Sequence, residues 1–95
     1  MSDQPIGIPI EDEIDLHAFA PSDIPSLVAE YIEAAAAAGF GEVRVVHGRG
    51  RGVQRGIVQA ALERHPRVVQ FWDDPAAHLG ATMARLAPVS RPSGS

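Results

Sequence analysis

Cysteine and lysine are both missing from this 95-residue sequence, and long apolar runs are missing as well. Without cysteine the chain can form no disulfide, no thiolate zinc site and no cysteine nucleophile, which fits a reducing compartment. A membrane-spanning helix needs about 20 consecutive apolar residues, and no run approaches that length. The N-terminus also lacks the basic and apolar pattern of a secretory signal. We therefore expect a cytoplasmic protein without a membrane segment.

Aromatic residues are scarce too, at 5% of the chain, whereas hydrophobic residues in total make up 45%. A single domain of this length must therefore build a modest core from aliphatic side chains. The two ends are rich in proline, glycine or serine and show no periodic apolar pattern. We expect a flexible leader over 1–10, a folded domain over 11–87 and a disordered tail over 88–95.

Basic residues are absent from the first 42 positions, which hold nine of the twelve acidic residues. All eight basic residues, every one an arginine, lie in 43–95 beside three acids, so that part carries a local balance of +5 while the whole chain carries −4. An arginine can bind a phosphate through two parallel hydrogen bonds. The distribution of charge, unlike its average, therefore indicates a basic face suited to nucleic acid.

Apolar periodicity predicts four strands and two helices. Alternating or β-branched runs are typical of strands, and apolar residues three and four positions apart are typical of a helix with one buried face. In the second helix this pattern predicts that Val53, Ile57, Ala61 and Leu62 face the core. The predicted order is strand 14–17, helix 24–38, strand 42–46, helix 53–64, strand 68–72 and strand 82–86.

This β-α-β-α-β-β order places the domain in the α/β class. A crossover that contains a helix joins parallel strands, so we expect 14–17 and 42–46 to be parallel, with a right-handed connection. Two helices and four strands indicate a two-layer sandwich in which both helices cover one face of a four-stranded sheet.

A strand, a glycine-rich loop and a helix follow one another between Val43 and Gly56. This order aims backbone N–H groups and the positive end of a helix at an anion. Glycines and arginines alternate in the loop, and a further arginine lies one turn into the helix, so we expect a phosphate-binding site. Its candidate residues are Gly48, Arg49, Gly50, Arg51, Gly52 and Arg55.

Asp15, His17 and His47 lie at the ends of the first two predicted strands. The carboxyl ends of parallel strands meet at one edge of a sheet, where open α/β sheets bind ligands, so we expect these side chains to converge beside the glycine loop. Two imidazoles can divide the proton transfers of phosphodiester cleavage, one accepting a proton from the attacking hydroxyl or water and the other donating one to the leaving oxygen. Asp15 would orient His17, and the arginines and N–H groups would stabilise charge on phosphorus.

The same three side chains also make a set of two histidines and one carboxylate. Such a set can hold a divalent metal, here Mg²⁺ or Mn²⁺. The sequence alone leaves metal-assisted and metal-free cleavage both open.

These motifs together resemble the Smr (small MutS-related) domain family, over roughly residues 11–87. The resemblance implies a fold like the C-terminal domain of translation initiation factor three, a mixed sheet whose last strand is antiparallel to the others. The matching segments are Ile14-Asp15-Leu16-His17, His47-Gly48-Arg49-Gly50, and Gly80-Ala81-Thr82 at the start of the last strand.

The family resemblance also implies a function, namely binding of DNA or RNA and, in several members, nicking or endonucleolytic cleavage. Matched onto this chain, it implies Asp15, His17 and His47 as catalytic residues and adds Thr82 to the candidate phosphate-binding residues. One departure is Ala18, at a position where the family often has glycine; a backbone that needed a positive φ there would be strained by alanine.

Two other functions stay open at the level of sequence. A module that binds nucleic acid or phosphate without cleaving it needs only the glycine loop and its arginines. A small phosphorylated ligand at the same loop is the third alternative.

Overall fold

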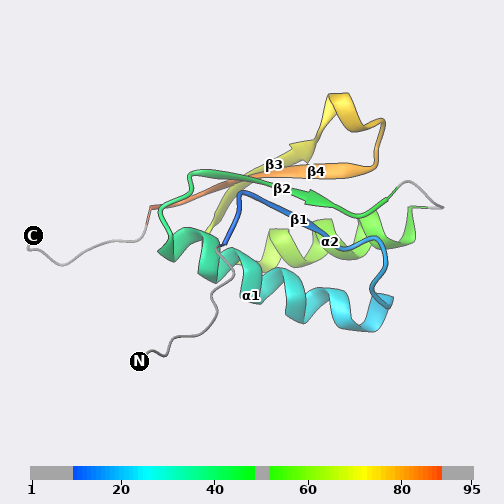
Figure 1. Ribbon diagram of the computed structural model, residues 1–95, viewed down its shortest axis with the longest axis horizontal. Coiled ribbons are helices and arrows are strands. Elements are labelled where there is room, and N and C mark those ends of the chain that lie inside the picture. The colour runs from blue at the N-terminus through cyan, green and yellow to red at the C-terminus, as the bar shows by residue number, and fades with distance from the viewer. Residues whose placement is uncertain (1–9, 49–51, 89–95) are drawn as a thin grey trace, which may run out of the picture.

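The structure is a computed structural model that describes residues 10–48 and 52–88. Two layers are visible in it, a four-stranded sheet and a pair of helices packed against one of its faces (Figure 1). The expected leader and tail lie outside the described residues, apart from their innermost positions. The elements in chain order are β1 (Glu13–Asp15), η1 (Pro21–Asp23), α1 (Ile24–Ala37), β2 (Glu42–Val46), α2 (Val53–Arg64), β3 (Val68–Asp73), η2 (Pro75–Ala77) and β4 (Ala81–Leu86).

The sheet has the order β1-β2-β4-β3. β1 and β2 are parallel, while β4 is antiparallel to both of its neighbours, β2 and β3. The predicted α/β class, the mixed four-stranded sheet with an antiparallel last strand and the single helical layer are therefore confirmed. Neither α1 nor α2, the helices of the described part of the chain, is long and apolar enough to cross a membrane.

The strand register separates two kinds of side chain onto the two faces of the sheet, because successive residues of a strand point to opposite faces. Ile14 pairs with Val45, and Val45 pairs with Thr82, which makes one row on the face that the helices cover. Val45 and Thr82 in that row are fully buried. On the open face the corresponding row consists of Glu13, Arg44, Met83 and Trp72.

Helix α1 supplies the largest share of the core. Its buried residues recur at the expected helical spacing, and the helix ends before Gly39, whose φ of 93° only glycine adopts without strain. The hydroxyl of Tyr31 donates a hydrogen bond to the carbonyl of Glu11, which ties the segment before β1 to the helix. The buried residues of α1 are Ile24, Val28, Tyr31, Ile32, Ala35 and Ala36.

Helix α2 has the predicted bounds, and two of its predicted core residues, Ala61 and Leu62, are buried. Val53 is 58% exposed, so its predicted place in the core was wrong, whereas Val58 is fully buried together with Leu62. At 3.6 residues per turn, Val53 lies about 140° around the helix from Val58. A buried stripe centred on Val58 and Leu62 therefore turns Val53 toward solvent, and Ile57 remains at the edge of the core.

Helix α2 offers a matched test of this buried face. Replacing Val58 with Ala should lower the free energy of unfolding by about 2 kcal/mol, because two buried methyl groups are lost and a cavity remains. Replacing Val53 with Ala should change it by no more than about 0.5 kcal/mol. Both variants gain the same helix propensity, so that contribution cancels in the comparison. Urea denaturation measures both values, and equal losses would contradict the observed orientation of α2.

Candidate functional site

The ends of β1 and β2 lie against each other, as the sequence predicts. The backbone N–H of Leu16 donates to the carbonyl of Val46 at 2.7 Å, which extends the parallel pairing past the last residue of β1. Gly48 has a φ of 82°, and a Cβ placed on it would lie 3.2 Å from the Cβ of His17. The D-L-H segment and the His47-Gly48 turn are therefore direct neighbours at the carboxyl edge of the sheet.

Asp15 and His17 form an exposed pair at this edge. One carboxylate oxygen of Asp15, Oδ1, accepts hydrogen bonds from the backbone N–H of His17 at 3.0 Å and from its ring Nδ1 at 2.6 Å. These two hydrogen bonds, the backbone one first, hold the pKa of Asp15 below its ordinary value. A carboxylate that accepts from Nδ1 fixes the proton on that nitrogen and leaves Nε2 as the reactive position. The His17 side chain is 63% exposed, so Nε2 is open to a ligand.

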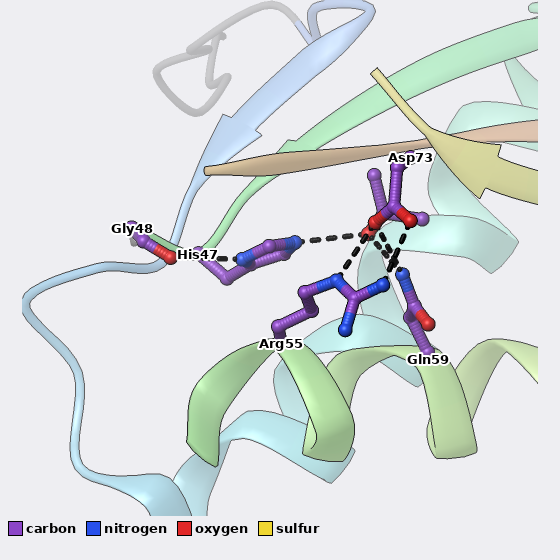
Figure 2. Close-up of polar contacts among 6 residues, drawn as sticks. His47, Gly48, Arg55, Gln59 and Asp73 are labelled. Atoms are coloured by element: carbon purple, nitrogen blue, oxygen red, sulfur yellow. Dashed lines mark hydrogen bonds and ion pairs between the residues drawn. The ribbon is translucent and has the colours of Figure 1, made fainter. Parts of the chain in front are cut away.

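His47 has the opposite environment, because it is only 1% exposed. Its Nδ1 lies 3.1 Å from the carbonyl of Gly48, and its Nε2 lies 2.9 Å from the hydroxyl of Thr82 (Figure 2). A carbonyl only accepts, so Nδ1 carries the proton, and Nε2 of the neutral ring accepts from Thr82. Burial is the main cause of a lowered pKa for His47, and the nearby Arg55 lowers it further.

Behind His47, hydrogen bonds continue to the surface of α2. The amide nitrogen of Gln59 donates both to the hydroxyl of Thr82 and to a carboxylate oxygen of Asp73, each at 3.0 Å. Asp73 in turn accepts two parallel hydrogen bonds of 2.7 Å from the guanidinium of Arg55 (Figure 2). We call His47, Thr82, Gln59, Asp73 and Arg55 the buried polar network, after its buried members His47 and Thr82; the side chains of Arg55 and Asp73 are about one third exposed.

The two histidines therefore differ in what they can do. The expectation that both rings open on one pocket is not met, because the ring of His47 is enclosed while that of His17 is exposed. Strand alternation explains the difference: His47 continues the row of Val43 and Val45 on the helix-covered face. Within residues 10–48 and 52–88, no hydrogen bond or ion pair links the His47 side chain to Asp15 or His17.

The candidate phosphate-binding residues are only partly placed. Gly48 donates its backbone N–H to the carbonyl of Gly80 at 2.9 Å, so this group is engaged within the fold. Thr82 is fully buried and its hydroxyl belongs to the network, which corrects the expectation of direct phosphate contact. Gly52 precedes α2 with a φ of 83°. Arg55 is paired with Asp73, and Arg49, Gly50 and Arg51 lie outside the described residues.

Alanine at position 18 causes no backbone strain. The non-glycine residues with a positive φ in the described part of the chain are His78 and Leu79, both in the turn before β4. Ala18 therefore does not occupy the left-handed region, and the missing family glycine does not disturb the Asp15–His17 pair.

The fit of a divalent metal to Asp15, His17 and His47 is poor. The described residues contain no group of three or more histidine, aspartate or glutamate side chains placed to hold a metal ion. Both ring nitrogens of His47 are engaged in hydrogen bonds, and Nδ1 of His17 is engaged by Asp15. These three side chains do not form a chelating set.

Two residues of the network, Gln59 and Asp73, were not identified from sequence. Arg55 and Gln59 are four positions apart on a helix, so they share one side of it. That spacing was the available signal for Gln59. Asp73 extends β3 by one residue beyond the predicted strand, where the Asp-Asp-Pro sequence indicated only a turn.

The fold and this edge define a class of protein: a two-layer α/β domain with an exposed Asp-His pair beside a His-Gly turn. A family model described as the Smr domain matches residues 14–86. The chain belongs to the Smr domain family.

Several known proteins share this domain. The Smr domain of MutS2 from Thermus thermophilus superimposes with a TM-score of 0.76 at 33% identity, covering 80% of this chain and 98% of that one. YdaL, a stand-alone small MutS-related protein from Escherichia coli, has the same fold, with a TM-score of 0.75 at 23% identity over 83% of this chain and 66% of its own.

Among sequences, a protein named endonuclease MutS2 from Thermomicrobium roseum is 35% identical over 80 residues, which are 81% of this chain and 10% of that protein. The protein of the same name from Clostridium tetani is 36% identical over 62 residues, which are 65% of this chain and 8% of that protein. This chain therefore spans about a tenth of the length of these relatives.

The contact between Gly48 and His17 can be tested with two glycine variants. Gly48→Ala and Gly39→Ala should each lower stability by about 1–2 kcal/mol, because each puts a Cβ on a left-handed residue. Only Gly48→Ala should also shift the NMR signals of the His17 ring, because the added Cβ meets His17 whereas nothing lies within 4 Å at Gly39. Unchanged His17 signals in Gly48→Ala would contradict the close approach of the two motifs.

Proposed function

We propose that this domain binds nucleic acid and acts as an endonuclease that nicks or cleaves DNA or structured RNA. The observation that supports this most directly is the exposed Asp15–His17 pair, joined at 2.6 Å and adjoining the Gly48 turn. This pair lies in a domain that is 33% identical to the Smr domain of Thermus thermophilus MutS2. The relatives named endonuclease MutS2 are 35–36% identical to this chain over the matched residues.

The proposed cleavage uses His17 for proton transfer. Asp15 keeps the ring proton on Nδ1, so the lone pair of Nε2 faces the substrate. Nε2 accepts the proton of the attacking water or hydroxyl while the new P–O bond forms. The resulting imidazolium, stabilised by the Asp15 carboxylate, then donates that proton to the leaving oxygen as the second P–O bond breaks. His47 takes part from the buried side of the site, through its hydrogen bond to the Gly48 carbonyl.

Phosphate binding is the proposed role of the glycine loop. Arg49 and Arg51 and the N–H groups of Gly50 and Gly52 would hold the phosphate and stabilise its developing charge. Arg55 already uses Nε and one terminal nitrogen on Asp73, and its other terminal nitrogen can still donate to a phosphate. The cysteine-free composition supports a cytoplasmic location for this activity.

Cleavage can be measured on supercoiled plasmid and on structured RNA with matched histidine variants. His17→Asn should lower the cleavage rate about 100-fold or more, because it removes the proton-transfer group. Asp15→Asn should lower it as well, because an amide can present N–H to the ring and allow the wrong tautomer. His78→Asn is the control, since asparagine tolerates the left-handed φ of that turn residue. Equal cutting by His17→Asn and wild type would reject the assigned role.

The second candidate function is a module that binds nucleic acid without cleaving it. The burial of His47 favours it, because only one imidazole of the expected two faces solvent. This function predicts binding that weakens with salt, and Arg51→Ala should reduce the slope of log K against log salt by roughly 1. The control is Arg67→Ala, whose guanidinium lies near Glu33 at 3.8 Å. Binding of this kind with no turnover by wild type supports the module, and turnover that depends on His17 rejects it.

A further inference from the structure

We propose that His47 is a positioning residue, held neutral by the buried polar network, and that His17 is the only histidine of the pair that transfers a proton. This inference rests on the proposed cleavage function and assigns different roles to the two histidines of that same site. It replaces two cooperating imidazoles with one exposed reactive ring and one buried structural ring.

The hydrogen bonds of the network have only one consistent set of directions. The Asp73 carboxylate only accepts, so Gln59 must turn its amide nitrogen toward it, and the same nitrogen lies 3.0 Å from Thr82. The Thr82 hydroxyl thus accepts from Gln59 and has one proton left to donate. That proton is directed to Nε2 of His47, at 2.9 Å. Every donor in this part of the network then has an acceptor.

A second proton on His47 would break this arrangement. It would sit on Nε2, facing the hydroxyl that now donates to that nitrogen, and the Thr82 proton would lose its acceptor. The imidazolium would also be buried, at a residue that is 1% exposed. The charged groups that act on the ring are Arg55 on α2, which opposes protonation, and Asp73 on β3, which favours it. Burial is the largest influence and outweighs the hydrogen bond to Gly48, which raises the pKa, so the pKa of His47 is lowered and the neutral ring is favoured.

What the neutral ring holds in place is the Gly48 peptide. Nδ1–H of His47 donates to the Gly48 carbonyl, and the backbone N–H groups of His47 and Gly48 both donate to the carbonyl of Gly80. The Gly48 residue is thereby fixed with its left-handed φ and its Cα facing the Cβ of His17. The network therefore acts on catalysis through His17, by fixing the backbone against which the reactive histidine lies.

Arg55 forms the outer end of the same network. Its two parallel hydrogen bonds of 2.7 Å orient the Asp73 carboxylate, which in turn orients Gln59 (Figure 2). A residue expected to bind phosphate is thus also the outer support of a buried histidine. Five side chains, from α2, β3, β4 and the residue that follows β2, share this function.

NMR of the wild-type protein tests the proposal without any substrate. The ring nitrogens of His47 should show a pyrrole-type ¹⁵N signal at Nδ1 and a pyridine-type signal at Nε2. Because the pKa of His47 is lowered, this neutral pattern should persist as the pH falls through about 6.5, the ordinary midpoint of histidine. A ring that is protonated at that pH, or that carries its proton on Nε2, would overturn the proposal.

Cleavage kinetics provide the second test. His47→Asn keeps an amide N–H near the position of Nδ1, where it can donate to Gly48, but it cannot transfer a proton. If His47 only positions, this variant should lose about 10- to 100-fold in rate, whereas His17→Asn should lose substantially more. The pH dependence of kcat/KM should match that of wild type. Equal losses in His47→Asn and His17→Asn, in proteins that both fold, would overturn the proposal.

Thr82 offers a matched pair of variants for the network itself. Thr82→Ser keeps the hydroxyl and should retain activity within about 3-fold, while Thr82→Val keeps the shape but leaves Nε2 and Gln59 without their partner and should lose about 10-fold or more. Equal activity of the two would overturn the network. Failure of the proposed cleavage function can be distinguished from failure of this inference. In the first case wild type would not cleave, while the NMR pattern of His47 would still be that of the neutral ring.

Discussion

The site depends on one short piece of backbone pairing, the parallel contact between β1 and β2. β1 has only three residues, and its pairing is extended by the hydrogen bond from Leu16 to Val46. This contact places the D-L-H segment at the same sheet edge as the His47 turn. Without it, the D-L-H segment and the His47 turn, which are about thirty positions apart in the sequence, would not be held side by side.

The local sequence pattern predicted the helices and strands of this fold well, because each pattern lies within a few consecutive residues. The bounds of β2 and α2 agree with the predicted ones, since a β-branched run and a helical apolar stripe need no distant partner to be recognised. The burial of His47 could also have been predicted from the sequence, because Val43, Val45 and His47 lie at every second position and therefore share one face of the strand. The ion pair between Arg55 and Asp73 was not, because only the tertiary fold brings α2 to the end of β3.

The uneven charge distribution has a structural meaning that composition does not convey. Acids of the first half partly neutralise arginines of the second half in the fold: Arg44 bonds to Glu13 at 3.0 Å, and Arg67 lies 3.8 Å from Glu33. Arg44 and Arg55 are also paired with Asp74 and Asp73. The local excess of positive charge in the second half therefore overstates the basic surface.

Burying a histidine is unfavourable unless both ring nitrogens find partners, and a neutral ring needs one donor and one acceptor. The fold supplies both, the Gly48 carbonyl within the turn and the Thr82 hydroxyl on β4. The Gly48 carbonyl, which accepts, links His47 to its own turn. The Thr82 hydroxyl, which donates, is oriented by Gln59 on α2, which Asp73 on β3 holds in turn. A neutral buried imidazole thus couples the packing of the second helix to the shape of the Gly48 turn, while the Asp15–His17 pair stays exposed at the same sheet edge.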